Sequence, residues 1–203
     1  MRKFSHKMLK ISTACLFTLI AFIGGMWVFA PWDSFGVYAI EKARLAAAEK
    51  NVYLDYNGIS VSGVLIPTYT ISDVSLNSVL SKTSVSEITV RVLPLSSLLS
   101  GGLSLYVWLR SGETAIDTGH KLRHDGGRLK VTSAGDGVIF SNVSIEGDIG
   151  ILGDIEYTRD GVSNNALIIK VPDNLDMMMG FAGFFERAGA NEWRLKQNAA
   201  AEK

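Results

Sequence analysis

The longest apolar run in this chain extends from Ile11 to Trp32 without a charged residue and directly follows a basic N-terminus. At about 1.5 Å per residue, a helix over this run is about 33 Å long, enough to cross a hydrocarbon layer about 30 Å thick. Trp27 and Trp32 lie at its end, and indole rings are enriched where a span meets the headgroups. The pattern predicts a membrane anchor over 11–32, with Trp27 and Trp32 as its interfacial residues.

A cleaved signal peptide is the alternative interpretation of the same run. Signal peptides have a shorter apolar region, of about 7–15 residues, followed by small residues at the cleavage site. Here the run ends in bulky side chains, and a cut after Ala30 would leave Pro31 directly behind it. These features favour an uncleaved anchor.

The basic residues predict the orientation of this anchor. Four lysines or arginines lie within 1–10, whereas the nearest ones after the run, Lys42 and Arg44, are accompanied by Glu41. Segments rich in lysine and arginine stay on the cytoplasmic side of a membrane. We therefore expect a single-pass protein of the cell inner membrane, with residues 1–10 in the cytoplasm and the chain from Asp33 onward in the periplasm.

The segment behind the anchor predicts a juxtamembrane helix over 33–50. It is rich in alanine, a strong helix former, and Asp33 or Ser34 can cap its first turn. Gly36 is a weak point in this helix, where the chain can turn away from the membrane span.

From residue 51 to 196 the pattern changes to a period of two, which is typical of strands. Val52–Tyr56 and the strand from Ile59 to Ile66 flank Asn57-Gly58, which predicts a hairpin with a type I′ turn. Short glycine-rich connections are expected at Gly101-Gly102, Gly126-Gly127 and Asp160-Gly161, and a helical turn at Leu95–Leu99. Further strands are expected at Tyr69–Leu76, Glu87–Leu93, Leu103–Arg110, Arg128–Ser133, Val138–Ile145, Ile149–Thr158, Ala166–Val171 and Glu192–Lys196.

The predicted fold class is therefore mainly β, with an N-terminal transmembrane helix and a short helix before the strands. The β-rich domain is expected to be a curved antiparallel sheet or groove, or a sandwich. A C-terminal amphipathic helix is expected at about 174–187, followed by a polar tail at 197–203.

The C-terminal helix carries an unusually wide apolar surface of methionine and phenylalanine. One interpretation is that it covers the open end of the sheet. The other is a surface for a partner helix, a membrane or a lipid chain, since methionine surfaces adapt to varied apolar shapes. The candidate contact residues are Met178, Met179, Phe181, Phe184 and Phe185.

Charge and polar residues exclude several classes of function. The chain has 20 basic and 20 acidic residues; without the four basic residues before the anchor, 16 remain against 20, a net charge of about −4. Such a domain is a poor candidate for nucleic acid binding, which requires basic surface. We expect no enzyme, no cofactor and no metal. Asp117, His120, His124 and Asp125 form the strongest metal-like cluster, but they lie in a segment that reads as a polar loop.

The chain combines a basic start, a single predicted span, Pro31-Trp32, and the segments 52–63, 66–76 and 136–149 in this order. This order resembles the type II secretion system protein N family, which belongs to a wider AsmA-like group. The resemblance implies a non-enzymatic protein of the inner membrane and periplasm that is associated with secretion machinery. The AsmA-like relatives imply, in addition, lipid transport along a β groove.

Two classes of function follow from these observations. The first is an accessory component of type II secretion machinery that binds secretion or envelope proteins. The second is a lipid-binding or lipid-transport protein with phospholipid as its partner. A lipid carrier should keep a continuous apolar face open, lined by residues such as Leu105, Val107, Ile149 and Ile151, whereas an assembly subunit should bury that face.

Overall fold

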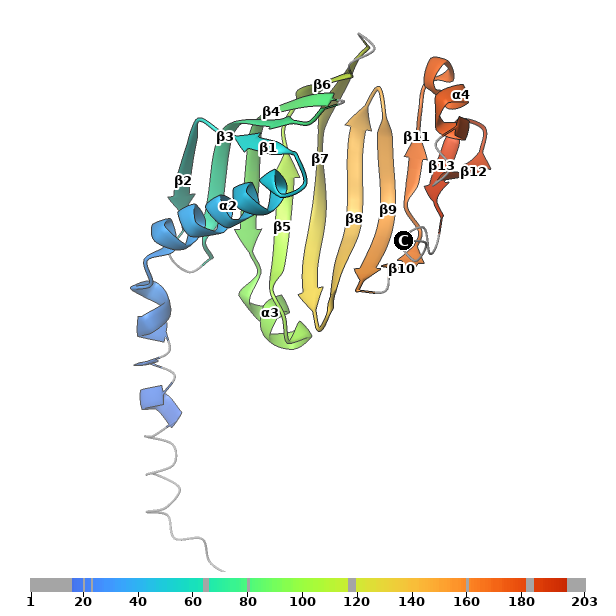
Figure 1. The fold of residues 1–203 in the computed structure, drawn as a ribbon. Coiled ribbons are helices and arrows are strands. Elements are labelled where there is room, and N and C mark those ends of the chain that lie inside the picture. The colour runs from blue at the N-terminus through green and yellow to red at the C-terminus, as the bar shows by residue number, and fades with distance from the viewer. Residues whose placement is uncertain are drawn as a thin grey trace, which may run out of the picture.

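The computed structural model describes residues 16–19, 21–22, 24–63, 66–79, 81–116, 120–159, 161–181 and 185–196. Its described strands form one antiparallel sheet in the order β1-β3-β4-β5-β7-β8-β9-β11-β13-β12, with β2 beside β3, β6 beside β4 and β7, and β10 beside β9 (Figure 1). The elements are α2 (Trp32–Ala48), β1 (Tyr53–Asp55), β2 (Gly58–Ser62), β3 (Thr68–Asn77), β4 (Ser81–Val92), α3 (Pro94–Ser100), β5 (Ser104–Leu109), β6 (Gly112–Ile116), β7 (Lys121–Ala134), β8 (Gly137–Gly147), β9 (Gly150–Thr158), β10 (Gly161–Asn165), β11 (Ile168–Lys170), α4 (Asp173–Phe181), β12 (Phe185–Gly189) and β13 (Glu192–Leu195).

The predicted mainly β class and its antiparallel pairing are confirmed. The sandwich alternative is wrong, because the described strands all belong to a single sheet. The helical turn expected at Leu95–Leu99 is also confirmed as α3, which starts with Pro94 and ends at Gly101 in the left-handed conformation.

The hairpin predicted around Asn57-Gly58 is wrong. β1 and β2 do not pair with each other; both pair with β3, β1 along its second half and β2 along its first. A type I′ turn requires positive φ at both central residues, and neither Asn57 nor Gly58 has it. The two strands are instead successive pieces of one edge, joined where the Asn57 amide donates to the carbonyl of Ser72 at 3.0 Å.

The C-terminal helix is shorter than its apolar pattern predicts. α4 ends at Phe181, and Phe185 already lies in strand β12, opposite Leu195 of β13. Gly180 and Gly183 interrupt the sequence here, and glycine in a helix interior costs about 1 kcal/mol relative to alanine. The strand pairing therefore replaces the last turns of the expected helix.

The connection predicted at Gly126-Gly127 is wrong as well, because both glycines lie inside the long strand β7. The register between β7 and β8 shifts between His124 and Gly126, and Gly126 has a φ of 130°. β7 continues past this irregularity. Its residues before the irregularity pair with β6, and its residues after it pair with β5. The glycines thus permit a bulge in a continuous strand instead of ending it.

The helix predicted over 33–50 is present as α2, but it begins one residue earlier than expected and its N-cap is Pro31, without a side-chain cap bond. A second helical stretch, Leu16–Val28, precedes it and meets it at a bend of 61°. Among the described residues no single helix is long and apolar enough to cross a membrane, whereas this bent pair passes the same length and composition test when taken together.

Candidate functional site: an apolar sheet face between two helices

One face of the sheet carries apolar side chains in continuous rows that cross the strands. Residues that pair in register on antiparallel strands project from the same face, so the pairing defines each row. Three such rows cross the strands, and we refer to them together as the apolar face. The first row is Ile59, Ile71, Ile88, Leu109, Gly127, Ile145, Ile151, Ile169 and Trp193; the second is Val61, Tyr69, Val90, Val107 and Leu129; the third is Val92, Leu105, Val131, Phe140 and Ile155.

Helix α2 covers the β2–β3 end of the apolar face. A Cβ atom on Gly36 would lie 2.4 Å from the Tyr69 ring and 3.2 Å from Cδ1 of Ile59, so the helix backbone rests directly on these side chains. The Tyr69 hydroxyl donates to the carbonyl of Trp32 at 3.2 Å, and burial raises the pKa of Tyr69 above its usual value. Gly36, a weak point in the sequence, is therefore the point of closest approach.

Helix α4 covers the other end of the apolar face. Leu175 packs with Val171 and Trp193 in a buried cluster, and Met179 and Phe185 lie against that cluster. Trp193 is 5 % exposed and ends the first row. This cluster is the core of the C-terminal end.

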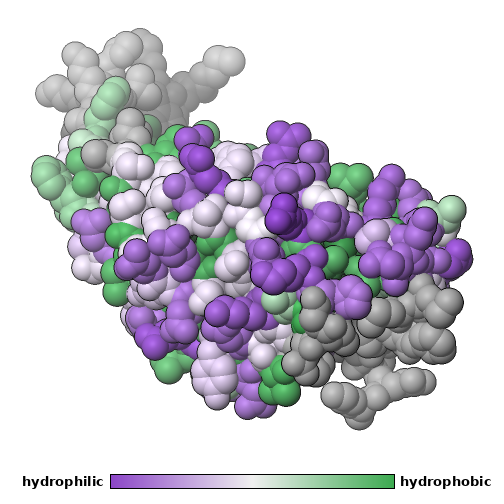
Figure 2. All heavy atoms as spheres, turned by 90° about the horizontal axis from the view of Figure 1, so that it is seen from above, coloured by the Kyte–Doolittle hydropathy of each residue, from purple (hydrophilic) through white to green (hydrophobic). Residues whose placement is uncertain are grey.

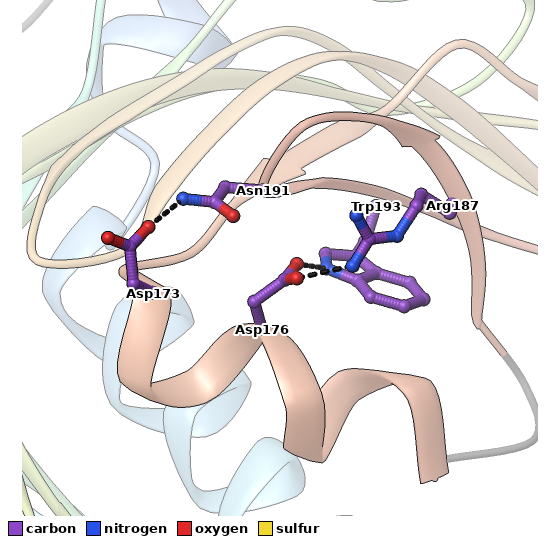
Figure 3. A network of polar contacts seen from close by, with 5 residues as sticks. All are labelled: Asp173, Asp176, Arg187, Asn191 and Trp193. Atoms are coloured by element: carbon purple, nitrogen blue, oxygen red, sulfur yellow. Dashed lines mark hydrogen bonds and ion pairs between the residues drawn. The ribbon is translucent and has the colours of Figure 1, made fainter.

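A polar network locks α4 onto β12 and β13 beside this core (Figure 3). The indole N–H of Trp193 donates to Oδ1 of Asp176 at 2.8 Å, and the Arg187 guanidinium donates to Oδ2 of the same carboxylate. Arg187 also lies over the Trp193 ring, 5.1 Å from its centroid, and the Asn191 amide donates to Asp173. The network satisfies the indole N–H, which would otherwise be buried without a partner.

The apolar face is less covered between the two helices. Tyr69, under α2, and Trp193, beside α4, are buried, whereas every other apolar side chain of the three rows is half-buried. Val107, in the middle of the second row, shares this intermediate exposure with its neighbours Val90 and Leu129. The face is thus an apolar surface bounded by two helices, wide enough for an extended apolar ligand or a partner element.

The predicted residues of the C-terminal contact surface are distributed between the core and undescribed positions. Met179 and Phe185 pack against the buried cluster of Val171, Leu175 and Trp193. The side chains of Met178 and Phe181, and residue Phe184 as a whole, lie outside the described residues. The contact surface stays a prediction.

The two predicted anchor tryptophans lie on either side of the helix bend. Their ring centroids are 4.5 Å apart, and the Trp32 indole donates to the carbonyl of Trp27 at 3.0 Å. Together with Met26, Ala30 and Phe35 they line an apolar pocket of about 370 Å³. Their role at a membrane interface is not tested by this arrangement and stays a prediction.

The metal-like cluster of the sequence is not assembled among the described residues. No group of three or more histidine, cysteine, aspartate or glutamate side chains placed to hold a metal occurs within them. His124, expected in a loop, lies on β7 opposite Gly112, and its ring fills the space above that glycine. Asp117 lies outside the described residues.

A shallow polar cleft of about 640 Å³ lies near the irregularity of β7. It brings basic and acidic side chains together, and one of them, Arg110, is already paired with Glu87 at 2.8 Å. This mixture of basic and acidic side chains indicates no particular class of ligand. The cleft is lined by Leu109, Arg110, Ser111, Asp125, Gly126, Gly127, Arg128, Ser144 and Glu146.

Sequence reasoning identified apolar alternation in individual strands but missed the lateral rows. Leu105, Val107 and Ile151 were expected on one apolar face, and the strand register places them on it. Ile149 lies directly before β9 and packs against the C-terminal cluster, which contains Trp193 of the first row. The alternation was the available signal; the register that joins the strands into rows depends on long-range pairing.

Comparison with known proteins gives one family. The family described as "Type II secretion system protein GspN-like, Synergistales" matches residues 9–197. No curated protein and no solved structure matches the chain.

Proposed function

Because the chain belongs to the type II secretion system protein GspN-like family, we propose that it is a membrane-anchored accessory component of type II secretion machinery that acts by protein interaction. The family match is the observation that carries this proposal, and it points to no enzymatic role. In this proposal residues 11–32 hold the chain in the cell inner membrane, with residues 1–10 in the cytoplasm and the sheet in the periplasm.

The shape of the N-terminal part supports this arrangement. Phe22, Met26 and Phe29 are exposed large apolar side chains, 64 %, 62 % and 87 % accessible. Apolar surface of this extent on a helix requires a lipid or protein environment. The four basic residues before it supply the cytoplasmic retention signal.

A topology experiment tests the anchoring and orientation. Alkaline phosphatase fused behind Lys203 is expected to be active, because the enzyme requires the periplasm, and a fluorescent protein that folds only in the cytoplasm is expected to be dark at the same position. A full-length product should remain with the membrane after washing at alkaline pH. An inactive phosphatase with a bright cytoplasmic reporter would overturn the proposed orientation, and a shortened, soluble product would overturn the anchor.

The protein-interaction role is tested by photo-crosslinking in the native host. Because the chain itself leaves the apolar face half-buried, in this role the partner must cover it. A photoreactive amino acid at Val107, on the open part of that face, is therefore expected to crosslink to a component of the secretion machinery. The same amino acid at Thr89, on the opposite face of the neighbouring strand, is the matched control. Crosslinks to no protein at Val107 would count against this role.

A second candidate function, phospholipid binding on the apolar face, is favoured by one specific observation. The rows between Tyr69 and Trp193 are continuous and half-buried, as an acyl-chain surface requires. Native mass spectrometry of the full chain in mild detergent is expected to show bound phospholipid. Val107→Glu should remove the lipid because it places a charge on the apolar face, whereas Thr89→Glu should retain it. Equal lipid loss in both variants, or no lipid in the wild type, would overturn this candidate.

A further inference from the structure

Two uncharged segments meet at the end of the sheet beside the start of α2. The first, residues 56–72, contains the connection between β2 and β3; the second, residues 92–109, contains α3. The Val92 amide donates to the carbonyl of Pro67 at 3.1 Å, so the two connections lie side by side. We call this part of the molecule the uncharged end.

The large apolar side chains of α3 are directed away from the domain. Leu95, Leu98 and Leu99 are 78 %, 80 % and 90 % exposed, and no residue of α3 is buried. Ile66, on the neighbouring connection, is also exposed. Three adjacent leucines this exposed on an uncharged surface mark a contact with a membrane or another apolar partner.

The uncharged end lies on the same side of the domain as the N-terminal helix. Tyr69, near the start of β3, bonds to the carbonyl of Trp32, the residue at which α2 begins. Figure 1 shows the N-terminal helix leaving α2 toward the side on which α3 projects. The helix that carries the leucines therefore lies on the side of the domain toward which the predicted anchor runs.

The opposite end of the molecule has a different surface. Figure 2 shows mostly hydrophilic residues there, with hydrophobic ones scattered between them. An ion pair joins Lys121 to Glu113 at 2.9 Å, and the Arg123 amide donates to the Asp148 carboxylate at 2.7 Å. A lipid surface accepts the uncharged end more readily than this one, because burying charged groups in an apolar medium is costly.

Aromatic and basic side chains lie on β4 and β5, the strands that precede and follow α3. The rings of Tyr106 and Trp108 are 4.4 Å apart, and the Arg91 guanidinium lies 5.4 Å from the centre of the Trp108 ring. Lys130 pairs in register with Tyr106. Tyrosine and tryptophan are enriched at headgroup depth, and basic side chains there attract anionic phosphates.

We propose that the uncharged end docks on the phospholipid bilayer, with the α3 leucines in the apolar boundary and Arg91, Tyr106 and Trp108 at headgroup depth. The docking rests on the anchoring proposed above, since the anchor holds this end against the membrane. It gives the domain a second membrane contact and a defined orientation. The open part of the apolar face then begins at the lipid surface.

The test uses the full chain with Cys15→Ser, reconstituted in vesicles of phosphatidylethanolamine and phosphatidylglycerol. A fluorophore is attached at Leu98→Cys, and its quenching by spin-labelled phospholipid and by aqueous iodide is measured. Phe22→Cys reports the predicted anchor, and Val79→Cys, 82 % exposed in the connection between β3 and β4 at the opposite end of the sheet, is the matched aqueous control. The Leu98 label is expected to lose most of its emission to the lipid quencher and to be protected from iodide, whereas the Val79 label behaves in the opposite way.

The outcomes separate docking from anchoring. A Leu98 label as accessible to iodide as the Val79 label, together with a Phe22 label in lipid, overturns the docking and leaves the anchor in place. Both labels in water would overturn both proposals.

A second variant tests whether the leucines themselves carry the contact. The label is placed at Leu95→Cys, with and without Leu98→Glu and Leu99→Glu. Because no residue of α3 is buried, the charged variant is expected to fold. Its label should move from lipid to water; a label that stays in lipid would overturn the assignment of the contact to these leucines.

Discussion

The two helices at the ends of the apolar face are held by different chemistry. α2 rests on Tyr69 and Ile59 through Gly36, and it leaves Phe35, Tyr38 and Leu45 more than half exposed. α4 buries Leu175 and is locked by charged and polar groups around Asp176. The C-terminal end therefore satisfies its side chains within the domain, whereas the N-terminal end leaves apolar surface for an environment outside it.

This difference indicates which end of the sheet leaves apolar surface uncovered by the domain itself. A polar network around a buried tryptophan specifies one arrangement of α4, because each donor needs its acceptor. The apolar contact at Gly36 positions α2 on the sheet, but it does not determine what covers the outer side of the helix. The apolar surface left at the end next to the predicted anchor supports the membrane contact proposed above.

The largest effect on this comparison is expected from Trp193→Ala, which removes the centre of the C-terminal core. The free energy of unfolding should fall by about 3–5 kcal/mol, as for other buried large-to-small changes. Denaturant unfolding of the full chain in detergent, followed by circular dichroism, measures it. Trp108→Ala, at a half-buried position on the opposite face, is the control and should cost less. Equal losses would mean that the C-terminal end has no distinct core.

The polar lock of α4 is tested by Asp176→Ala. This change leaves the indole N–H of Trp193 buried without its acceptor, so the free energy of unfolding should fall by about 1–3 kcal/mol. Asp173→Ala is the matched carboxylate control on the same helix; its partner Asn191 is a neutral amide and the bond is exposed, so a smaller loss is expected. If Asp173→Ala costs as much, the network does not act through the tryptophan.

The apolar contact of α2 is tested by Gly36→Ala. In an open helix this change gains about 1 kcal/mol, but here the new Cβ would lie 2.4 Å from the Tyr69 ring, and we expect a net loss of about 1–2 kcal/mol from overpacking. Gly58→Ala, whose Cβ would have nothing within 4 Å, is the control and should change the free energy of unfolding little. A gain in stability for Gly36→Ala would show that α2 does not rest on this glycine.

The smallest effect is expected from Tyr69→Phe, which keeps the ring under α2 and removes only the bond to the Trp32 carbonyl. The loss should be about 0.5–1.5 kcal/mol, typical of one hydrogen bond. Thermal unfolding together with the tryptophan emission of the helix bend measures it. Tyr157→Phe, on an exposed tyrosine, controls for the loss of a hydroxyl. Equal losses of stability in the two variants would mean that the hydroxyl bond does not contribute and that only the Tyr69 ring holds α2.

Much of the strand content could be predicted from the sequence because alternation is a local property. The alternation in Val90-Arg91-Val92 and in Leu105-Tyr106-Val107 indicates strands with one apolar side, and both segments lie in the sheet. The pairing partners could not be predicted in the same way. Asn57-Gly58 is a strong local hairpin signal, yet β3 offers a longer run of partners to both flanking strands than they offer to each other.

The sequence predicted which types of residue form the candidate site, but not the long-range contacts that bound it at its two ends. The sequence indicated an apolar face and a methionine- and phenylalanine-rich C-terminus, and it gave no sign that Gly36 approaches Tyr69 or that Asp176 meets Trp193. Both contacts join residues far apart in the chain, so local patterns carry no information about them.

By itself, the sequence determined the apolar anchor candidate, the period-two pattern of the domain and the helical turn at Leu95–Leu99, since hydrophobicity and periodicity are read residue by residue. Only the tertiary structure decided that the strands form one sheet and that their apolar residues align in rows between α2 and α4. It also placed α3, with Leu95, Leu98 and Leu99, on the side of the domain toward which the N-terminal helix runs (Figure 1). The physical reason is register: a strand carries its own apolar side, but only its hydrogen-bonded neighbours determine which residues lie next to it.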